Sequence, residues 1–158
     1  MTAFQGTTQP IRLDSSVQRI LGMHMLTCHP REACGLLLGA AAAGGMLISG
    51  YAPMSNVAPD PLHAFVPDPR EWVKALYSTP SPIGLFHSHP STPPWPSAAD
   101  LQGLSALGPE FKVYMIGSPG AEGNNLPELN GFIIDRQPGP DGKLSPQLLH
   151  TPIYALLK

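Results

Sequence analysis

The chain has 158 residues, a formal net charge of -2, and 13% charged against 42% hydrophobic residues. This length can bury the core of one domain but is short for two, so we expect a single domain over residues 1–158. The charge offers no basic surface for nucleic acid, and the hydrophobic content excludes a wholly disordered chain.

Two cysteines, Cys28 and Cys34, are too few for a disulfide framework. The first residues lack the basic and apolar segments of a secretory signal. The uncharged apolar stretch at 33–48 contains four glycines and is shorter than the roughly 20 residues that a membrane helix needs. These features predict a cytoplasmic protein that does not bind membranes.

The first predicted element is a helix over 14–28. Its apolar residues recur at helical spacing, and Asp14 or Ser15 stands where an N-cap is expected. The apolar runs at 33–38 and 46–51 are separated by small residues, which is typical of two strands joined in a hairpin. A helix followed by a hairpin therefore begins the domain.

The middle of the chain starts with a proline-rich loop over 52–62. Asp68 followed by Pro69 has the residue types of an N-cap and a first helical position, so a second helix should run to about Tyr77. A buried strand is expected over 82–89.

The last third contains a loop over 118–130 that is rich in glycine, proline and asparagine. A third helix is expected over 97–107, and two strands, at 111–116 and 129–134, flank this loop. A surface loop is expected over 137–146, and a final apolar run over 153–157 closes the sheet. Strands mixed with helices in this way predict an α/β or α+β fold.

Two histidines, His87 and His89, end the predicted strand over 82–89. Because side chains alternate along a strand, both imidazoles share one face and Ser88 takes the other. Two imidazoles on one face make half of a metal site. For the pair alone, two partly exposed strand residues remain the alternative.

The segment after His89 adds a carboxylate to the pair. Pro93, Pro94 and Pro96 restrict this segment, which lowers the entropy lost when Asp100 is brought against the histidines. Two histidines and one carboxylate leave the fourth position of tetrahedral Zn²⁺ open, which is the pattern of catalytic zinc. A helix N-cap at Ser97 with an acid at Asp100 explains these two residues equally well.

The pattern H-x-H-P, six residues, S-x-x-D resembles that of the JAMM, or MPN-plus, zinc metalloproteases. In that family a glutamate precedes it beside an apolar strand, and here the matching segment is EACGLLLG, which begins at Glu32. Asn56 with Phe65 resembles a further family feature. The likeness spans about 17–135 and implies a short stand-alone prokaryotic-type JAMM/MPN domain with a core at about 13–136. Its implied fold is a mixed β-sheet flanked by helices, with a topology similar to that of cytidine deaminases.

The resemblance also implies roles for individual residues. His87, His89 and Asp100 would bind one Zn²⁺, and Glu32 would be the general acid/base for a zinc-bound water that attacks the substrate carbonyl. Ser97 would donate its hydroxyl to the oxyanion. Sequence spacing alone does not distinguish Glu32 from the other glutamates, which are Glu71, Glu110, Glu122 and Glu128.

The family hydrolyses peptide or isopeptide bonds that follow the C-terminal Gly-Gly of ubiquitin or a ubiquitin-like protein. The resemblance therefore implies a ubiquitin-like or sulfur-carrier protein as the partner. An extended tail could add to a sheet edge, and the loops over 52–62 and 118–130 are the expected places for recognition. The sequence does not predict an oligomeric state.

Other functions fit the motifs less well. A non-catalytic MPN-type scaffold is the main alternative, but such relatives lack the metal ligands. Zinc deaminases use H-x-E with P-C-x-x-C, and thermolysin-like proteases use H-E-x-x-H, and this chain has neither pattern. Trp95 either lines the cleft or covers the loop. Four histidines have no partner at ligand spacing: His24, His29, His63 and His150.

Overall fold

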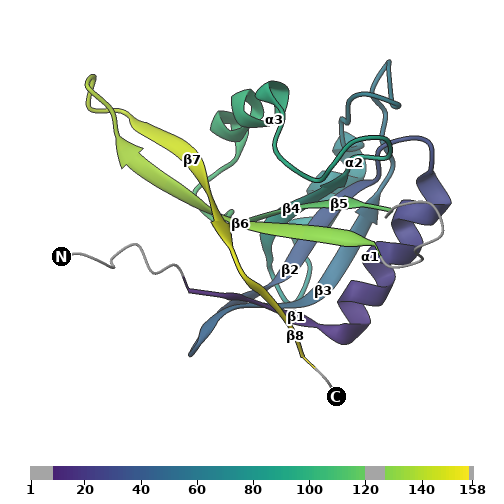
Figure 1. Cartoon of the computed structure of the whole chain (residues 1–158). Coiled ribbons are helices and arrows are strands. Elements are labelled where there is room, and N and C mark those ends of the chain that lie inside the picture. The colour runs from purple at the N-terminus through teal and green to yellow at the C-terminus, as the bar shows by residue number, and fades with distance from the viewer. Residues whose placement is uncertain (1–8, 120–126, 157–158) are drawn as a thin grey trace.

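The computed structural model describes residues 9–119 and 127–156. These residues form an eight-stranded sheet with the order β7-β6-β5-β4-β2-β3-β1-β8 (Figure 1). The strands are β1 (Ile11–Asp14), β2 (Cys34–Ala42), β3 (Gly45–Met54), β4 (Pro82–Ser88), β5 (Val113–Ser118), β6 (Glu128–Pro138), β7 (Leu144–Thr151) and β8 (Ile153–Leu156). The helices are α1 (Ser15–Cys28), α2 (Pro69–Ala75), α3 (Ala98–Gly103) and a 3₁₀ turn (Leu104–Ala106).

The sheet mixes both strand directions. β4 pairs with β5 in parallel, and β1 is parallel to both β3 and β8, whereas the other neighbours are antiparallel. Helices follow some strands and hairpins join others. The fold is thus of the α+β class with a mixed sheet, as the sequence predicts.

The sheet is strongly curled. β7 and β8 form its two edges, yet only Pro152 separates them in the chain, and its carbonyl accepts from the backbone N–H of Ile11 at 2.9 Å. Where the ends of the sheet meet, a Cβ added to Gly131 would lie 2.7 Å from Ile11 Cδ1 and 2.8 Å from Ile153 Cγ1. Glycine at 131 therefore leaves the room that the curled sheet needs.

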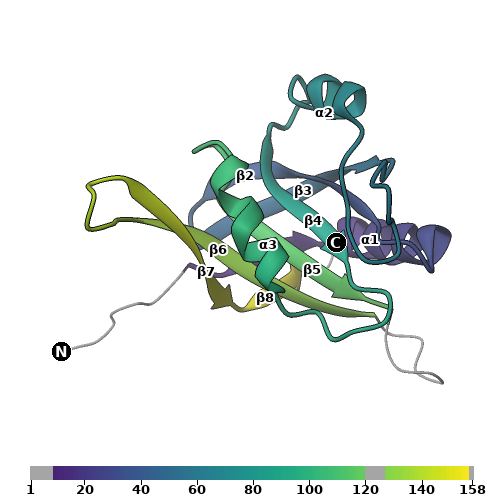
Figure 2. The same ribbon diagram turned by 90° about the horizontal axis from the view of Figure 1, so that it is seen from above.

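Two apolar cores lie on the two faces of the sheet. The first packs α1 through Val17, Leu21 and Met25 against the face that carries Phe86. The second includes Leu85 and packs against α2 and the 3₁₀ turn. Figure 2 shows α3 crossing the strands on the side of this second core. Burying each of these large side chains contributes about 1.5–3 kcal/mol, so both faces of β4 are held firmly.

Local capping explains where the helices begin. Asp14 precedes α1 and accepts from the backbone N–H of Ser16 at 3.2 Å, and Asp68 precedes α2 and accepts from that of Arg70 at 2.8 Å. Both predicted helix starts are confirmed, although α2 ends at Ala75, just short of the expected end. None of the helices in the described parts is long and apolar enough to cross a membrane.

The prediction of a surface loop over 137–146 is wrong. β6 continues to Pro138, a turn with Gly142 at φ 77° reverses the chain, and β7 begins at Leu144. This hairpin projects from the sheet, and its tip is exposed, so the apolar alternation of a half-buried strand is missing (Figure 1). Of the predicted loop over 118–130, residues 120–126 lie outside the described residues, and Glu128 already belongs to β6.

Candidate metal centre

The backbone of β2 and β4 brings Glu32 and the two histidines together. Cys34 pairs with His87, and the ladder continues because the Ser88 N–H donates to the Ala33 carbonyl at 3.0 Å. Ser88 points to the other face, as predicted, where its Oγ accepts from the Ala33 N–H at 2.8 Å. Glu32 is two residues before Cys34, which lies opposite His87, and side chains two residues apart share a face. Glu32 therefore stands on the face that carries both imidazoles.

The three residues that the sequence predicts as ligands converge on one point. His87 Nε2 lies 3.4 Å from Asp100 Oδ1, and His89 Nε2 lies 3.2 Å from Asp100 Oδ2. One ligand atom from each residue falls within a group whose members are all within 4.8 Å of one another. Two buried imidazoles and a half-buried carboxylate at these separations could hold a divalent metal ion.

Hydrogen bonding favours the tautomer of His89 that a metal requires. Its Nδ1 lies 3.0 Å from the carbonyl oxygen of Pro93, which can only accept. Nδ1 therefore donates to this carbonyl, and Nε2 points at Asp100 Oδ2, 3.2 Å away, which also only accepts. A metal ion between Nε2 and this carboxylate would satisfy both. A second partner that fixes the tautomer in this way is usual for metal-binding histidines.

His87 provides the test of whether a metal fits. Its ring is completely buried, and neither nitrogen has a hydrogen-bond partner among the described residues. The Glu32 carboxylate lies 3.3 Å from Nδ1 and the Asp100 carboxylate 3.4 Å from Nε2, but neither contact has hydrogen-bond geometry. A buried nitrogen without a partner is costly, and a metal ion at Nε2 would satisfy it.

The charges of the cluster also suit a cation. Burial opposes protonation of His87, but the carboxylates of Asp100 and Glu32 outweigh it and raise the pKa of His87. The two histidines lower the pKa of Asp100 well below its usual value, although burial acts in the opposite direction. The cluster thus draws in positive charge, which a divalent ion supplies better than protons do.

Aromatic rings fix the orientation of His87. Phe65 stacks on the imidazole with ring centroids 4.3 Å apart, and Tyr114 meets it edge-on at 5.6 Å. The loop that carries Phe65 is tied down by Asn56, whose amide donates to the carbonyls of Glu32 at 3.0 Å and of Ala64 at 2.9 Å. The pair Asn56 and Phe65, noted in the sequence only as a family-like feature, thus supports both Glu32 and His87.

Ser97 and Asp100 form a helix capping box at the start of α3. Ser97 Oγ accepts from the Asp100 N–H at 3.1 Å, and Asp100 Oδ2 accepts from the Ser97 N–H at 2.9 Å. The cap that the sequence suggests is therefore present, and the same carboxylate also faces the two imidazoles. The cap orients Asp100 without removing it from the cluster.

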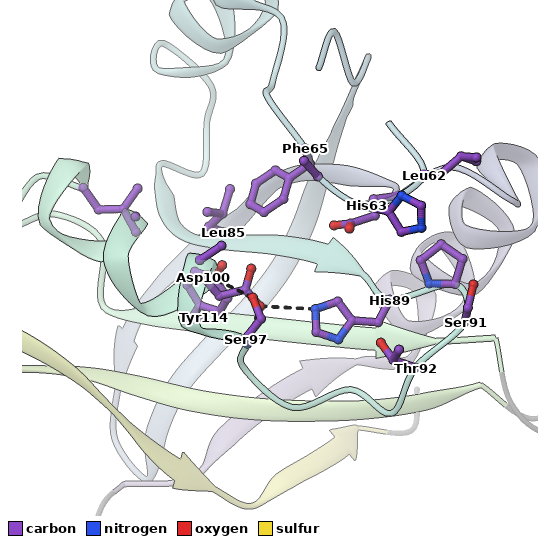
Figure 3. A pocket seen from close by; sticks show the side chains of 16 residues that line it. Leu62, His63, Phe65, Leu85, His89, Ser91, Thr92, Ser97, Asp100 and Tyr114 are labelled. Carbon is purple, nitrogen blue, oxygen red and sulfur yellow. Dashed lines mark hydrogen bonds and ion pairs between the residues drawn. The ribbon is translucent and has the colours of Figure 1, made fainter. Parts of the chain in front are cut away.

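A cavity of about 360 Å³ opens over these residues (Figure 3). Glu32, His89, Asp100 and Ser97 are among the residues that line it. In Figure 3 the apolar side chains of Phe65, Leu85 and Tyr114 lie on one side of the cavity, and His63, Ser91 and Thr92 lie on the other. A substrate in this cavity would pass directly over the candidate metal centre.

The residues that line the cavity distinguish Glu32 from the other glutamates. Glu32 is the glutamate among its described lining residues, whereas Glu71 accepts from the backbone N–H of Ser55 at 2.7 Å, and Glu122 lies outside the described residues. Glu110 and Glu128 are exposed and do not line it. Trp95 is not among these lining residues either, and its ring packs against His150 and Phe132.

The sequence did not indicate two further residues of the cavity, His63 and Tyr114, whereas it described Cys34 correctly. His63 lines the mouth of the cavity and pairs with Asp60 at 3.0 Å, although its spacing gave no sign of this. Tyr114 was missed because it belongs to a predicted strand and carries no motif. Cys34 is a buried core residue, as expected, and burial raises the pKa of its thiol to about 12.

Comparison with known proteins places this geometry in a family. A family model described as prokaryotic homologs of the JAB domain matches residues 14–128. The chain belongs to this family. The resemblance to JAMM/MPN proteins that the sequence motif indicated is thereby confirmed.

Two curated relatives of this prokaryotic JAB protein are named for their activity. The chain is 39% identical over 94 residues to the desampylase of Haloferax volcanii, and the match covers 57% of this chain and 64% of the relative. The chain is 35% identical over 83 residues to a probable TtuB-protein conjugate cleaving protease of Thermus thermophilus, and this match covers 50% of the chain and 53% of the relative. The chain therefore spans less than two thirds of the length of either relative.

Solved structures share the fold. A protein from Desulfitobacterium hafniense is 28% identical and superposes with a TM-score of 0.72, with 94% of both chains covered. A JAB1/MPN domain protein from Archaeoglobus fulgidus is 17% identical, with a TM-score of 0.50 over 90% of this chain and 98% of that one. The second likeness concerns the fold alone.

Proposed function

We propose that the chain is a zinc-dependent peptidase or isopeptidase. The observation that carries this proposal is the convergence of His87, His89 and Asp100 beside Glu32 in the wall of one cavity. Three protein ligands leave one coordination position open, as in catalytic rather than structural zinc sites. When bound, zinc lowers the pKa of water to about 7 and polarises a carbonyl oxygen.

Glu32 is the general acid/base in this proposal. Its carboxylate is buried, lines the cavity, and lies next to His87. From there it accepts a proton from the attacking water and returns that proton to the leaving amine. The backbone of Glu32 is held separately, because its N–H donates to the Pro61 carbonyl at 2.8 Å and its carbonyl accepts from Asn56.

Ser97 is proposed to stabilise the oxyanion. Its Oγ accepts from the Asp100 N–H within the capping box, which leaves the hydroxyl hydrogen free to donate. The side chain is exposed at the cavity wall, so this hydrogen can reach the oxygen on which negative charge develops. One hydroxyl thus serves the helix as an acceptor and the reaction as a donor.

The proposed substrate is a conjugate of a ubiquitin-like or sulfur-carrier protein, cut after its C-terminal Gly-Gly. The names of the two curated relatives support a substrate of this kind. β4 is paired with β2 and β5, so a tail would cross the cavity rather than add to β4. Glycines would allow its backbone to approach the centre closely, and Leu62 places the loop over 52–62 at the mouth.

A matched panel of fusions tests the proposal. A small ubiquitin-like protein is followed by a reporter after either Gly-Gly or Ala-Ala and incubated with the zinc-loaded chain, with or without a chelator. We expect cleavage of the Gly-Gly fusion only, abolished by the chelator and restored by zinc. Cleavage that survives chelation overturns the zinc mechanism, and equal cleavage of both fusions overturns the substrate assignment.

A further inference from the structure

The segment over 90–96, here called the proline strap, connects His89 to the start of α3. Its Pro93 carbonyl accepts from His89 Nδ1 at 3.0 Å and from the Trp95 N–H at 2.9 Å. This one carbonyl therefore helps to fix where the His89 ring points, with Nε2 directed at Asp100. Proline rings restrict φ in the strap, but they do not by themselves fix the direction of a carbonyl.

The strap is anchored by strands β6 and β7. The amide of Asn130 donates to the Pro94 carbonyl at 2.9 Å. The Trp95 ring meets His150 edge-on, with centroids 4.8 Å apart, and lies 6.1 Å from Phe132. Asn130 and Phe132 are two residues apart on β6 and thus share the face that carries the candidate metal centre.

We propose that Asn130 is a positioning residue for His89. The ring of Pro94 fixes its φ, so a hydrogen bond that holds the Pro94 carbonyl also limits rotation of the peptide that joins Pro93 to Pro94. Asn130 thereby keeps the Pro93 carbonyl aimed at Nδ1 of His89. The inference rests on the proposed function, because the ligand role of His89 is part of it.

Loss of this anchor has a defined chemical effect. If the Pro93 carbonyl turns away, the His89 ring loses the partner of Nδ1, and Nε2 is no longer held in the direction from which it would bind the metal. Changes to groups that orient metal ligands typically cost about 10- to 100-fold in metal affinity. Asn130 acts through one more carbonyl, so we expect the lower end of that range, about tenfold.

The test compares Asn130→Leu and Asn130→Ala with the parent. Leu is close in size to Asn and removes the donor without adding charge. Leu129→Ala is the matched control, because Leu129 is the adjacent residue on β6 and packs against the first core, on the opposite face. It weakens the strand without touching the strap. Zinc affinity is measured by competition with a chelator, and the ¹⁵N chemical shift of His89 Nδ1 reports whether its hydrogen bond to the Pro93 carbonyl is kept.

We expect both Asn130 variants to bind zinc about tenfold more weakly and to show a changed ¹⁵N shift at His89 Nδ1 because its hydrogen bond is weakened, with Leu129→Ala like the parent in both respects. Affinities of the Asn130 variants within about twofold of the parent, or an equal loss in Leu129→Ala, overturn the positioning role. A folded parent that binds no zinc overturns the proposed function as well, which distinguishes the two failures.

Discussion

At the scale of single residues, the backbone of Glu32 holds its place in the fold, whereas its carboxylate is proposed to move a proton. Its backbone is held by Pro61 and Asn56, so Glu32→Gln should keep the fold and the metal while removing the group that moves the proton. Turnover should fall by about 100- to 10,000-fold. The measurement is kcat together with zinc content. A variant that turns over within a few-fold of the parent would show that Glu32 has no part in proton transfer.

Ser97 has two proposed uses, which Ser97→Ala separates. Loss of a cap alone costs about 0.5–2 kcal/mol of stability and leaves turnover nearly intact. Loss of an oxyanion donor lowers turnover by about 100- to 1,000-fold with zinc retained. We expect both effects, because Oγ accepts in the cap while its hydrogen remains free to donate. Melting temperature and kcat measured together decide, and normal turnover in a destabilised variant leaves only the cap.

At the scale of elements, His24 joins α1 to β3. Its Nδ1 lies 2.7 Å from the Tyr51 hydroxyl, and burial lowers the pKa of His24. In the unfolded chain the His24 imidazole becomes protonated near pH 6.5, whereas in the folded chain it becomes protonated only at lower pH. The neutral His24 therefore contributes stability above pH 6.5 that is lost as the pH falls towards the folded pKa.

Urea unfolding at about pH 7.5 and about pH 5 measures this contribution. His24→Gln should lose less stability between the two values than the parent does. The control is His29→Gln, since His29 is exposed and should behave like the parent. An identical pH dependence in the parent and in His24→Gln would contradict the assignment.

Helix α3 forms part of the cavity wall, and Gly103 at its end offers a way to narrow the cavity. A Cβ added there meets no atom within 4 Å, and Gly lowers helix stability, so Gly103→Met should fold at least as well as the parent. We expect kcat/KM to fall by about tenfold with zinc content unchanged. Gln102→Met is the control, since Gln102 does not line the cavity. Equal kcat/KM in both variants would mean that substrate does not use this wall.

At the scale of the whole molecule, local patterns were predictable and long-range pairings were not. The shared face of His87 and His89 follows from strand alternation, and the cap at Asp68 follows from residue types next to one another. By contrast, β1 was not predicted, because its four residues become a strand only between β3 and β8. The same holds for the contribution of Tyr114, which is set by the pairing of β4 with β5.

The candidate site, too, was predictable from the sequence only in part. The spacing of the motif indicated the three candidate ligands, but the choice of Glu32 among the glutamates depended on family resemblance. In the structure that choice has a physical basis, since the pairing of β2 with β4 sets Glu32 beside His87. Asn130 carries no local signal at all, because its contact with Pro94 joins residues far apart in the chain.

Zinc content in the parent and in Asp100→Asn, both purified without chelator, tests the central claim most directly. We expect about one zinc per chain in the parent and little in the variant, because the carboxylate faces both imidazoles. If Asp100 serves only the helix, Asn costs about 0.3–1 kcal/mol of stability and leaves any metal in place. A parent without metal, or a variant with full zinc, would contradict the claim that His87, His89 and Asp100 form a catalytic zinc site.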